Sequence, residues 1–219
     1  MDKINIIPAK NDVIFRNLFG DERNKEFLVG FLESILGLTD DDLQYFDYDT
    51  IEYQDTEQML DHDFGNEGLV IIRLRTTYNK LLRIELHSMI TPPPIDRIVY
   101  YTSRLITLPA SAGEEHKRVN RAICIIITDG TLINSTNYHN RFTLFSNEAK
   151  EELTGLMEIH SLELSKLPLK SDRSKLYDWA KFFSAASEDE LKTLTKKNPT
   201  IGRACKKLIE LSCDEKLRI

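Results

Sequence analysis

The sequence contains no hydrophobic run long enough to cross a membrane. Its longest apolar stretch, Ala122 to Ile127, has six residues, whereas a spanning helix needs about 20. The opening segment, Met1 to Lys10, shows neither the basic start and apolar core nor the cleavage site of a secretion signal. We therefore expect a cytoplasmic protein that has no membrane partner.

Cysteine is also scarce, and the three that are present, Cys124, Cys205 and Cys213, lack metal-ligand spacing. Cys124 lies within the apolar stretch, where a cysteine is usually a small buried hydrophobic residue. A structural role is therefore favoured over a zinc or redox site. No internal repeat or low-complexity segment is visible, and 219 residues fit one main core with a small helical appendage.

The formal net charge of −6 argues at first against a nucleic-acid partner, but the charge is unevenly distributed. From Thr39 to Gly68 there are eleven acidic residues and no Lys or Arg. The rest of the chain has 24 acidic and 29 basic residues, a net charge of +5. Charge alone leaves two interpretations open, a polyanion partner or an ordinary solvated surface.

Helical signals lie at both ends of the chain. Asn11 and Asp12 can cap a first helix, which Gly20 stops, and a second helix ends at Gly37. The later signals are a helix from Ser174 to Ala186, a capping box at Ser187 and Glu190, and the helix start at Asn198 and Pro199.

A further capping box, Ser212 with Glu215, predicts one more helix, yet the sequence stops at Ile219. We therefore expect the chain to be truncated relative to its relatives, or to have lost this terminal helix.

The middle of the chain is rich in predicted strands. The clearest signal is a hairpin whose strands run from Val70 to Thr76 and from Leu81 to His87. A near-continuous apolar run from Arg121 to Thr128 predicts a strand buried on both faces. The other predicted elements are strands at Leu43 to Tyr53, Arg141 to Phe145 and Met157 to Leu164, an acidic turn at Asn147 to Glu152, and a helix from Ile95 to Leu108.

Side chains alternate along a strand, so the hairpin has two different faces. We assign one face to the core: Val70, Ile72 and Leu74 with Leu82, Ile84 and Leu86. The other face is polar and mostly basic, with Ile71 as the exception: Ile71, Arg73 and Arg75 with Arg83, Glu85 and His87. Three side chains of the next helix also share one side and are candidate nucleic-acid contacts: Arg97, Tyr101 and Arg104. The alternative is that Tyr101 packs and the arginines are solvated.

Several blocks of sequence, taken in order, resemble a bacterial family of recombination-promoting nucleases, the PD-(D/E)xK family transposases. The blocks are NDVIFRNLFG at Asn11 to Gly20, DRIVYYTSRL at Asp96 to Leu105, YHNRFTLF at Tyr138 to Phe145, and LTGLMEIHSLELSKL at Leu153 to Leu167. The DW pair at Asp178 and Trp179 and the tail beginning at Lys197 fit the same pattern.

This resemblance implies an α/β fold with a restriction-endonuclease-like core, a central mixed sheet flanked by helices, and a C-terminal helical segment. We expect residues 1–168 to form the nuclease-like domain and residues 169–219 to pack on it. The resemblance also implies DNA as a partner, bound without sequence preference, and Mg²⁺ or Mn²⁺ as the cofactor of an active member. A homodimer, or assembly with an intact paralogue, is a further expectation.

The family site pairs a carboxylate on one strand with Glu-x-Gln or Glu-x-Lys on the next, because two acids hold Mg²⁺ while the Gln or Lys orients water. Glu85 in RIELH matches the family glutamate, and His87 stands where Gln or Lys belongs. Fourteen residues before Glu85, Ile71 occupies the position of the family Asp. Isoleucine supplies no oxygen, so the resemblance implies a degenerate metal site.

Three acids are alternatives for the missing ligand. Asp61 and Asp63 can supply it if the preceding loop folds back, or if the family position is Asp61 itself; Asp12 on the first helix is a less favoured helper. Against Asp61, residues 70–76 have the strand character that the motif requires and MLDHDFG does not. Two functions follow as hypotheses: a DNA-associated protein with little or no Mg²⁺-dependent cleavage, and an active endonuclease that promotes recombination.

Overall fold

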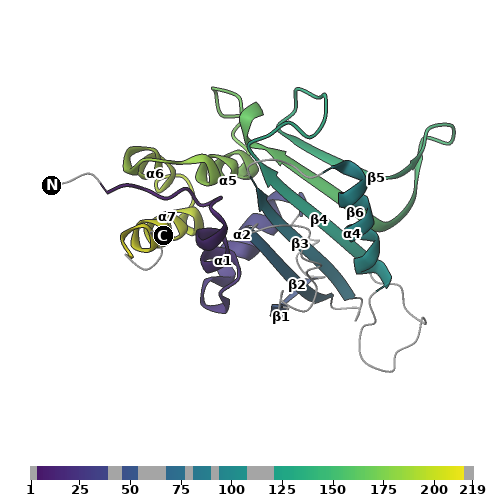
Figure 1. The fold of residues 1–219 in the computed structure, drawn as a ribbon, viewed down its shortest axis with the longest axis horizontal. Helices are drawn as coiled ribbons and strands as arrows, with labels where there is room; N and C mark the ends of the chain where they lie inside the picture. Colours follow the sequence, from purple (N-terminus) through teal and green to yellow (C-terminus); the bar gives the residue numbers. More distant parts are fainter. Residues whose placement is uncertain are drawn as a thin grey trace.

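The computed structural model describes residues 4–38, 46–53, 68–76, 81–89, 94–107 and 121–214. Its centre is a six-stranded sheet in the order β1-β2-β3-β4-β6-β5, with helices on both faces (Figure 1). The strands are β1 Phe46–Tyr53, β2 Gly68–Thr76, β3 Leu81–Met89, β4 Arg121–Thr128, β5 His139–Ser146 and β6 Glu151–Glu163. The helices are α1 Asp12–Phe19, α2 Lys25–Ile35, α4 Ile95–Thr107, α5 Lys175–Ser184, α6 Glu188–Leu194 and α7 Pro199–Cys213, with short 3₁₀ turns η1 Glu22–Asn24 and η4 Leu164–Lys166.

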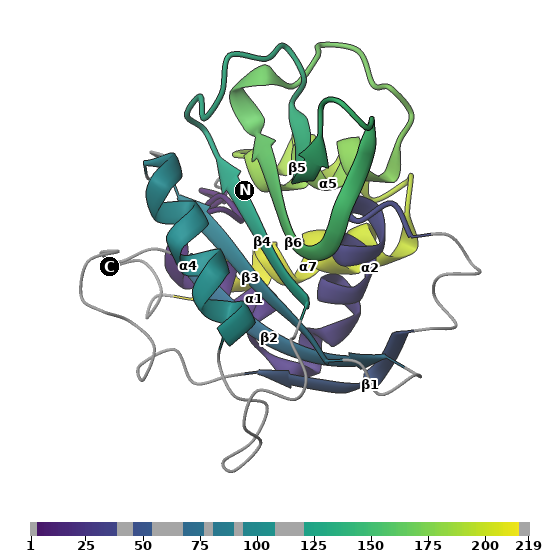
Figure 2. The same ribbon diagram turned by 90° about the vertical axis from the view of Figure 1, so that its right-hand side faces the viewer.

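The sheet is mixed, as expected. β1, β2 and β3 pair antiparallel, β3, β4 and β6 run parallel, and β5 pairs antiparallel with β6. α4 lies on one face of the sheet, whereas α1, α2, α5, α6 and α7 gather on the other (Figures 1 and 2). The α/β class, the mixed sheet flanked by helices and the C-terminal helices are therefore confirmed.

Most predicted helix boundaries are confirmed by their caps. The Asn11 side chain accepts hydrogen bonds from the backbone N–H groups of Val13 and Ile14, and the segment after α2 turns at Gly37, whose φ is +64°. Ser187 caps α6, and Asn198 caps α7 ahead of Pro199. At Asn11, Ser187 and Asn198 a short polar side chain satisfies backbone donors that the first turn of the helix leaves open.

Ser212 is the residue that the sequence predicts as the cap of a further helix. It lies within α7, it is fully buried, and its Oγ accepts a hydrogen bond of 3.1 Å from the backbone N–H of Ile7. This contact joins the end of α7 to the N-terminal segment, and the capping box stays a prediction. Glu215 and the rest of the predicted last helix lie outside the described residues.

The main core joins the two ends of the chain. Its aromatic centre consists of Phe15 and Phe19 of α1, Phe31 of α2, and Trp179 and Phe183 of α5, with ring centroids 5.1–6.5 Å apart. A smaller cluster of Met89, Ile98, Cys124 and Ile126 lies beneath α4. The domain boundary expected at residue 168 falls between η4 and α5, and helices on both sides of it contribute to the main core. That boundary stays a prediction.

β4 spans the predicted residues and is buried on both faces, as expected. β6 differs from the prediction, since it begins at Glu151 rather than Met157. Residues before Met157 pair with β5 alone, because β4 reaches β6 only from Met157 onward. Residues 144–156 therefore form a two-stranded projection, called here the β5–β6 arm (Figure 1). Its polar EELTG sequence has no buried alternation from which the longer strand could be predicted.

Candidate active site on the central hairpin

The candidate site lies on the hairpin formed by β2 and β3. The ladder runs from Gly68 opposite Ser88 to Arg75 opposite Leu81, and it places Ile71 opposite Glu85 and Arg73 opposite Arg83. Directly opposed residues in an antiparallel ladder share one face of the sheet. The predicted neighbour relation of Ile71 and Glu85 is therefore confirmed at the level of the backbone. Of the hairpin side chains, the structure describes those of Val70 and residues 87–89.

Val70 marks the inner face of the hairpin. It is buried in the main core, and a Cβ placed on Gly20, at the end of α1, would lie 3.6 Å from Val70 Cγ2. Side chains at positions 70 and 71 point to opposite faces of the sheet. Because Glu85 is paired with Ile71, it belongs to the face opposite Val70, on which α4 lies. The predicted assignment of Val70 to the core is confirmed.

The face that carries position 85 is buried at the end near His87. His87 is only 5% exposed, and Met89 packs in the cluster beneath α4 with Ile98 and Ile126. His87 pairs with Ile126 of β4 in the parallel ladder. The hairpin sequence assigns His87 to the polar face, and the packing beneath α4 buries this end of it.

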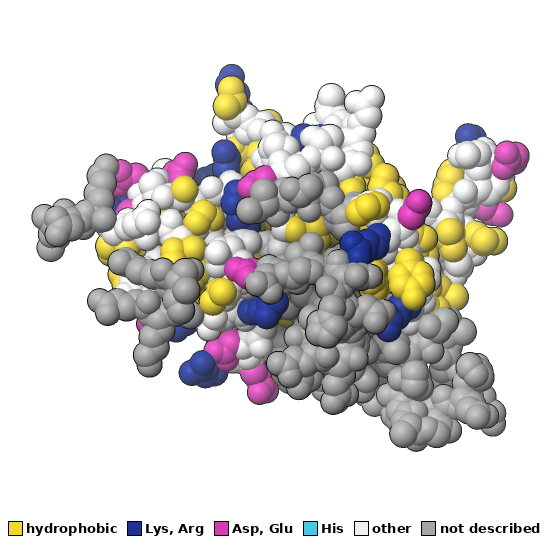
Figure 3. Space-filling view, viewed as in Figure 1, with side chains coloured by type: hydrophobic (Ala, Val, Ile, Leu, Met, Phe, Trp, Pro, Cys, Tyr) yellow, Lys and Arg dark blue, Asp and Glu magenta, His cyan; other side chains and the backbone are white. Residues whose placement is uncertain are grey.

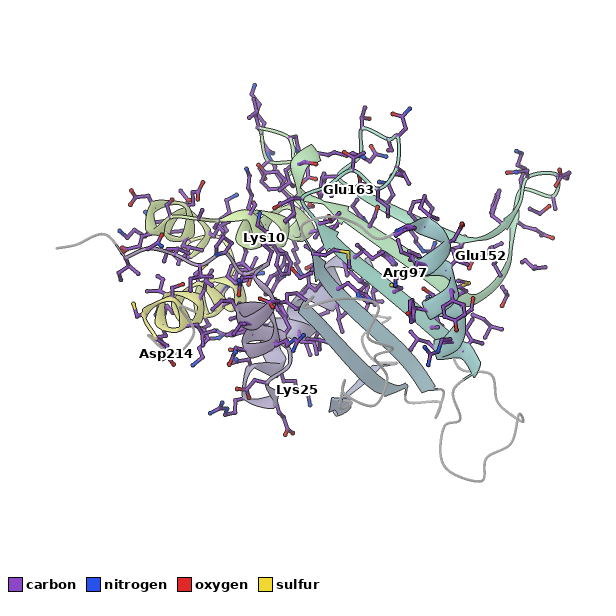
Figure 4. All side chains as sticks on the ribbon, in the orientation of Figure 1. Lys10, Lys25, Arg97, Glu152, Glu163 and Asp214 are labelled. Atoms are coloured by element: carbon purple, nitrogen blue, oxygen red, sulfur yellow. The ribbon has the colours of Figure 1, made fainter. Side chains whose placement is uncertain are left out.

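The predicted nucleic-acid contacts of α4 are half-buried rather than fully solvated. Ile98, Thr102 and Leu105 form the buried side of the helix, and Arg97, Tyr101 and Arg104 lie along its flank. The Arg104 guanidinium carbon is 5.7 Å from the centre of the Tyr101 ring, a cation–π distance. Figure 4 labels Arg97 beside α4, over the central strands. The structure thus brings Tyr101 and Arg104 together on the face of the sheet that carries position 85.

A family model described as PD-(D/E)XK nuclease family transposase matches residues 9–219. The chain belongs to this family. No curated protein and no solved structure matches it. None of the helices in the described part of the chain is long and apolar enough to cross a membrane.

For a PD-(D/E)XK family chain, the central question is which donors can hold a metal ion. In the β2–β3 ladder, Glu85 is paired with Ile71, whose side chain has no atom that can bind a metal ion. Asp61 and Asp63 lie outside the described residues, and Asp12 is in the first turn of α1, the helix that packs against the Val70 face. Among the residues that the structure describes, no three His, Cys, Asp or Glu side chains are grouped to hold a metal.

A cluster of charged side chains that the sequence did not single out lies on the neighbouring strands. Glu158 of β6 is 3% exposed, and it accepts hydrogen bonds from Arg121 of β4 at 2.6 Å and from Arg141 of β5 at 2.8 Å. Its Oε1 is also 2.7 Å from His160 Nε2, and His160 Nδ1 is 2.9 Å from His139 Nε2. We call these five residues the Glu158 cluster.

The electrostatics of the Glu158 cluster follow from its contacts. Burial alone would raise the pKa of Glu158, but hydrogen bonds from His160, Arg141 and Arg121 hold that pKa well below its usual range. Burial lowers the pKa of His139 to about 4, with His160 adding to the effect. Glu158 pairs with Ile123 of β4, whose side chain packs in the main core. The Glu158 cluster therefore lies on the opposite face of the sheet from position 85. The Glu158 cluster joins three strands. In the sequence, the signal for such a cluster is the polar residues at alternate positions of MEIHSLE, residues 157–163.

Proposed function

We propose that this PD-(D/E)XK family protein is associated with DNA and has a degenerate metal site with little or no Mg²⁺-dependent cleavage. The observation that carries the proposal is the pairing of Ile71 with Glu85 across the β2–β3 ladder. Mg²⁺ requires near-octahedral oxygen ligands and is usually bound through carboxylates. An isoleucine opposite the glutamate removes an oxygen pair and a negative charge from the place where the second ligand is needed.

His87 supports the same proposal. The family chemistry uses Gln or Lys at this position to orient the attacking water, and a buried imidazole beside Ile126 is poorly placed to do so. Imidazole also suits softer metals better than Mg²⁺. If a metal binds, Glu85 would hold it, and Mn²⁺ would tolerate a nitrogen ligand from His87 better than Mg²⁺ does. A bound ion would supply Lewis-acid polarisation of a phosphate.

The proposed DNA contacts are the basic residues on the same face of the sheet. Arg73 and Arg83 are paired across the hairpin, Arg75 is two residues further along β2, and Arg97 and Arg104 come from α4. Arginines that face phosphates bind DNA without reading bases, so the expected binding is independent of sequence. The net charge of +5 outside the acidic segment favours such binding.

The alternative function is an active metal-dependent endonuclease that uses Glu85 with Asp61 or Asp63. One observation favours it. Gly68, the first residue of β2, pairs with Ser88, so the segment that carries both aspartates enters the sheet one residue from His87. A carboxylate from this segment could then complete the site without a change at position 71.

Nicking of supercoiled plasmid in Mg²⁺ distinguishes the two functions. We expect the purified protein to fail, and the double variant Ile71→Asp with His87→Gln to recover more activity than either single change. The two repairs act on one unit, metal binding and water orientation, so their effects should be non-additive.

The control for a contaminating nuclease is Glu85→Ala, made in the unmodified and in the double-variant protein. Mn²⁺ is tested in parallel. Robust Mg²⁺-dependent nicking by the unmodified protein, abolished by Glu85→Ala, would contradict the degenerate site and indicate Asp61 or Asp63 as the missing ligand.

A further inference from the structure

Two loops meet at the end of the sheet where β4 and β6 finish. Residues 129–138 connect β4 to β5, and residues 167–174 connect η4 to α5. We call them the edge loops. Both lie at the top of the molecule in two perpendicular views, next to each other (Figures 1 and 2).

Hydrogen bonds fix the edge loops to each other. The Tyr138 hydroxyl donates to Asp172 Oδ2 at 2.6 Å, and Lys166 Nζ donates to the carbonyl oxygen of Ile133 at 2.7 Å. Arg173 has a φ of +68°, a left-handed conformation that is uncommon for any residue other than glycine. The surrounding hydrogen bonds therefore hold the second edge loop in a defined shape, with an arginine at a position that a free chain would rarely adopt.

Exposed cations dominate the outer surface of the edge loops. The side chains of Lys170, Arg173 and Lys175, the first residue of α5, are exposed, and within the described part of the chain none of the three makes an ion pair. Both acids of the edge loops, Asp129 and Asp172, are bound within the protein, one by an ion pair and the other by a hydrogen bond. This surface is therefore positively charged, although the whole chain has a net charge of −6.

Leu169 projects from the same surface. It is fully exposed, and in the edge loops, which the structure describes throughout, no other large apolar side chain is exposed. Figure 3 shows Lys or Arg and hydrophobic side chains together at the top of the molecule, over the loop that precedes α5. The other edge loop supplies exposed hydroxyl and amide groups, from Thr131, Asn134, Thr136 and Asn137. A protein partner is recognised by a contiguous apolar patch, which a single leucine among polar residues does not supply.

We propose that the edge loops bind duplex DNA through its phosphates and insert Leu169 between two base pairs. Lys, Arg, Thr and Asn side chains are common contacts of phosphate and sugar. A single apolar side chain can enter the minor groove, unstack a base step and kink the duplex. The inference rests on the proposed association with DNA, and it adds a second contact surface, separate from the hairpin arginines.

The strand register places the edge loops within reach of a duplex that lies on the hairpin. Met89 is paired with Thr128, and Thr128 with Glu163, so β3, β4 and β6 end at the same level. Glu85 lies four residues before Met89 in β3, a distance of about 13 Å at the rise of a strand. One turn of duplex DNA is about 34 Å long, so one duplex can contact both surfaces.

The phosphate contacts are tested by the salt dependence of DNA binding, measured by fluorescence anisotropy on an end-labelled duplex. Lys170→Gln with Lys175→Gln should weaken binding, and the slope of log K against log salt should become shallower by about 1.8, which is 0.9 for each of two phosphates. The matched control is Lys196→Gln with Lys206→Gln. These two lysines are also exposed, make no ion pair within the described residues and lie at the start of and within α7, so the net charge changes equally. Equal slopes for the two double variants would overturn the proposal.

Insertion of Leu169 is tested by energy transfer between dyes at the two ends of a short duplex. We expect the unmodified protein to raise the transfer efficiency, because a kink brings the ends together. Leu169→Ala should abolish most of that rise while leaving the salt slope unchanged, since it removes no charge. A rise that Leu169→Ala leaves intact, or no rise with the unmodified protein, would reject the insertion.

The hairpin variant Arg73→Ala with Arg75→Ala and Arg83→Ala is measured on the same duplex, and circular dichroism verifies that every variant is folded. Weakened binding in the hairpin variant, with none in Lys170→Gln with Lys175→Gln, would reject the edge loops and leave the proposed function standing. No DNA binding by the unmodified protein would reject both.

Discussion

At the scale of single residues, the Glu158 cluster shows how a buried charge is stabilised in this sheet. One carboxylate accepts hydrogen bonds from arginines on β4 and β5, and it also contacts His160 on its own strand. Removing one partner of a buried ionic group is costly because the remaining charge is left without compensation. The cluster therefore fixes the relative positions of β4, β5 and β6 at the base of the β5–β6 arm.

His139 makes the stability of the protein depend on pH. Its pKa is lowered to about 4 in the folded protein, whereas an unperturbed histidine titrates near 6.5. Between these values the unfolded chain binds the proton and the folded chain does not. The free energy of unfolding should thus fall as the pH decreases from about 6.5 to about 4, by roughly 1–3 kcal/mol.

Urea unfolding at a series of pH values in this window measures the effect. His139→Gln should reduce the slope of the unfolding free energy against pH, because it removes the titrating group. Thr143→Ser, on the same strand and without a titrating group, serves as the control. Equal slopes for His139→Gln and the unmodified protein would show that other groups dominate.

At the scale of elements, the β2–β3 hairpin is the part of the fold that the sequence predicts best. Strict alternation on two neighbouring runs specifies both strands and their shared face, and the pairing of Ile71 with Glu85 follows from it. The burial of His87 is not predictable from the hairpin, because it depends on α4, a later element. The Glu158 cluster was not predicted, because its residues come from three strands and come together only in the assembled sheet.

The same hairpin carries the prediction for DNA binding. Replacing Arg73, Arg75 and Arg83 by alanine should weaken binding to unrelated DNA sequences to the same degree. The slope of log K against log salt should become shallower by about 0.9 for each phosphate that an arginine no longer neutralises. Fluorescence anisotropy across a salt series measures both quantities.

Arg203→Ala is the matched control for the hairpin arginines. Arg203 is an exposed α7 residue paired with Glu26 of α2, so it belongs to the helical layer and not to the hairpin. An unchanged slope in the hairpin variant, or an equal weakening of binding in Arg203→Ala, would place the DNA contact elsewhere.

At the scale of the whole molecule, α5 packs in one aromatic core with the first two helices. Phe183 of α5 contacts the rings of Phe15, Phe19 and Phe31 from the first two helices. A chain that ends at residue 168 would expose this aromatic cluster. We expect the fragment to lose its cooperative thermal transition, as measured by circular dichroism.

A point variant separates this effect from that of a shorter chain. Phe183→Ala in the full chain should lower the free energy of unfolding by about 3–5 kcal/mol, because it leaves a cavity in the aromatic core. Leu169→Ala, at a fully exposed position, should change it by less than about 0.5 kcal/mol. A fragment of residues 1–168 that melts cooperatively at the temperature of the full chain would contradict the shared core.

The hydrogen bond from the Ile7 backbone to Ser212 joins positions 205 residues apart, and it has a consequence for biosynthesis. Ribosomes add about 5–20 residues per second. α5 and α7, which pack on α1 and α2, are therefore synthesised about ten seconds or longer after them. Contacts between such distant positions also slow folding. During translation the phenylalanines of α1 and α2 therefore lack the packing that Phe183 of α5 supplies, and we expect chaperones to bind the nascent chain at this stage.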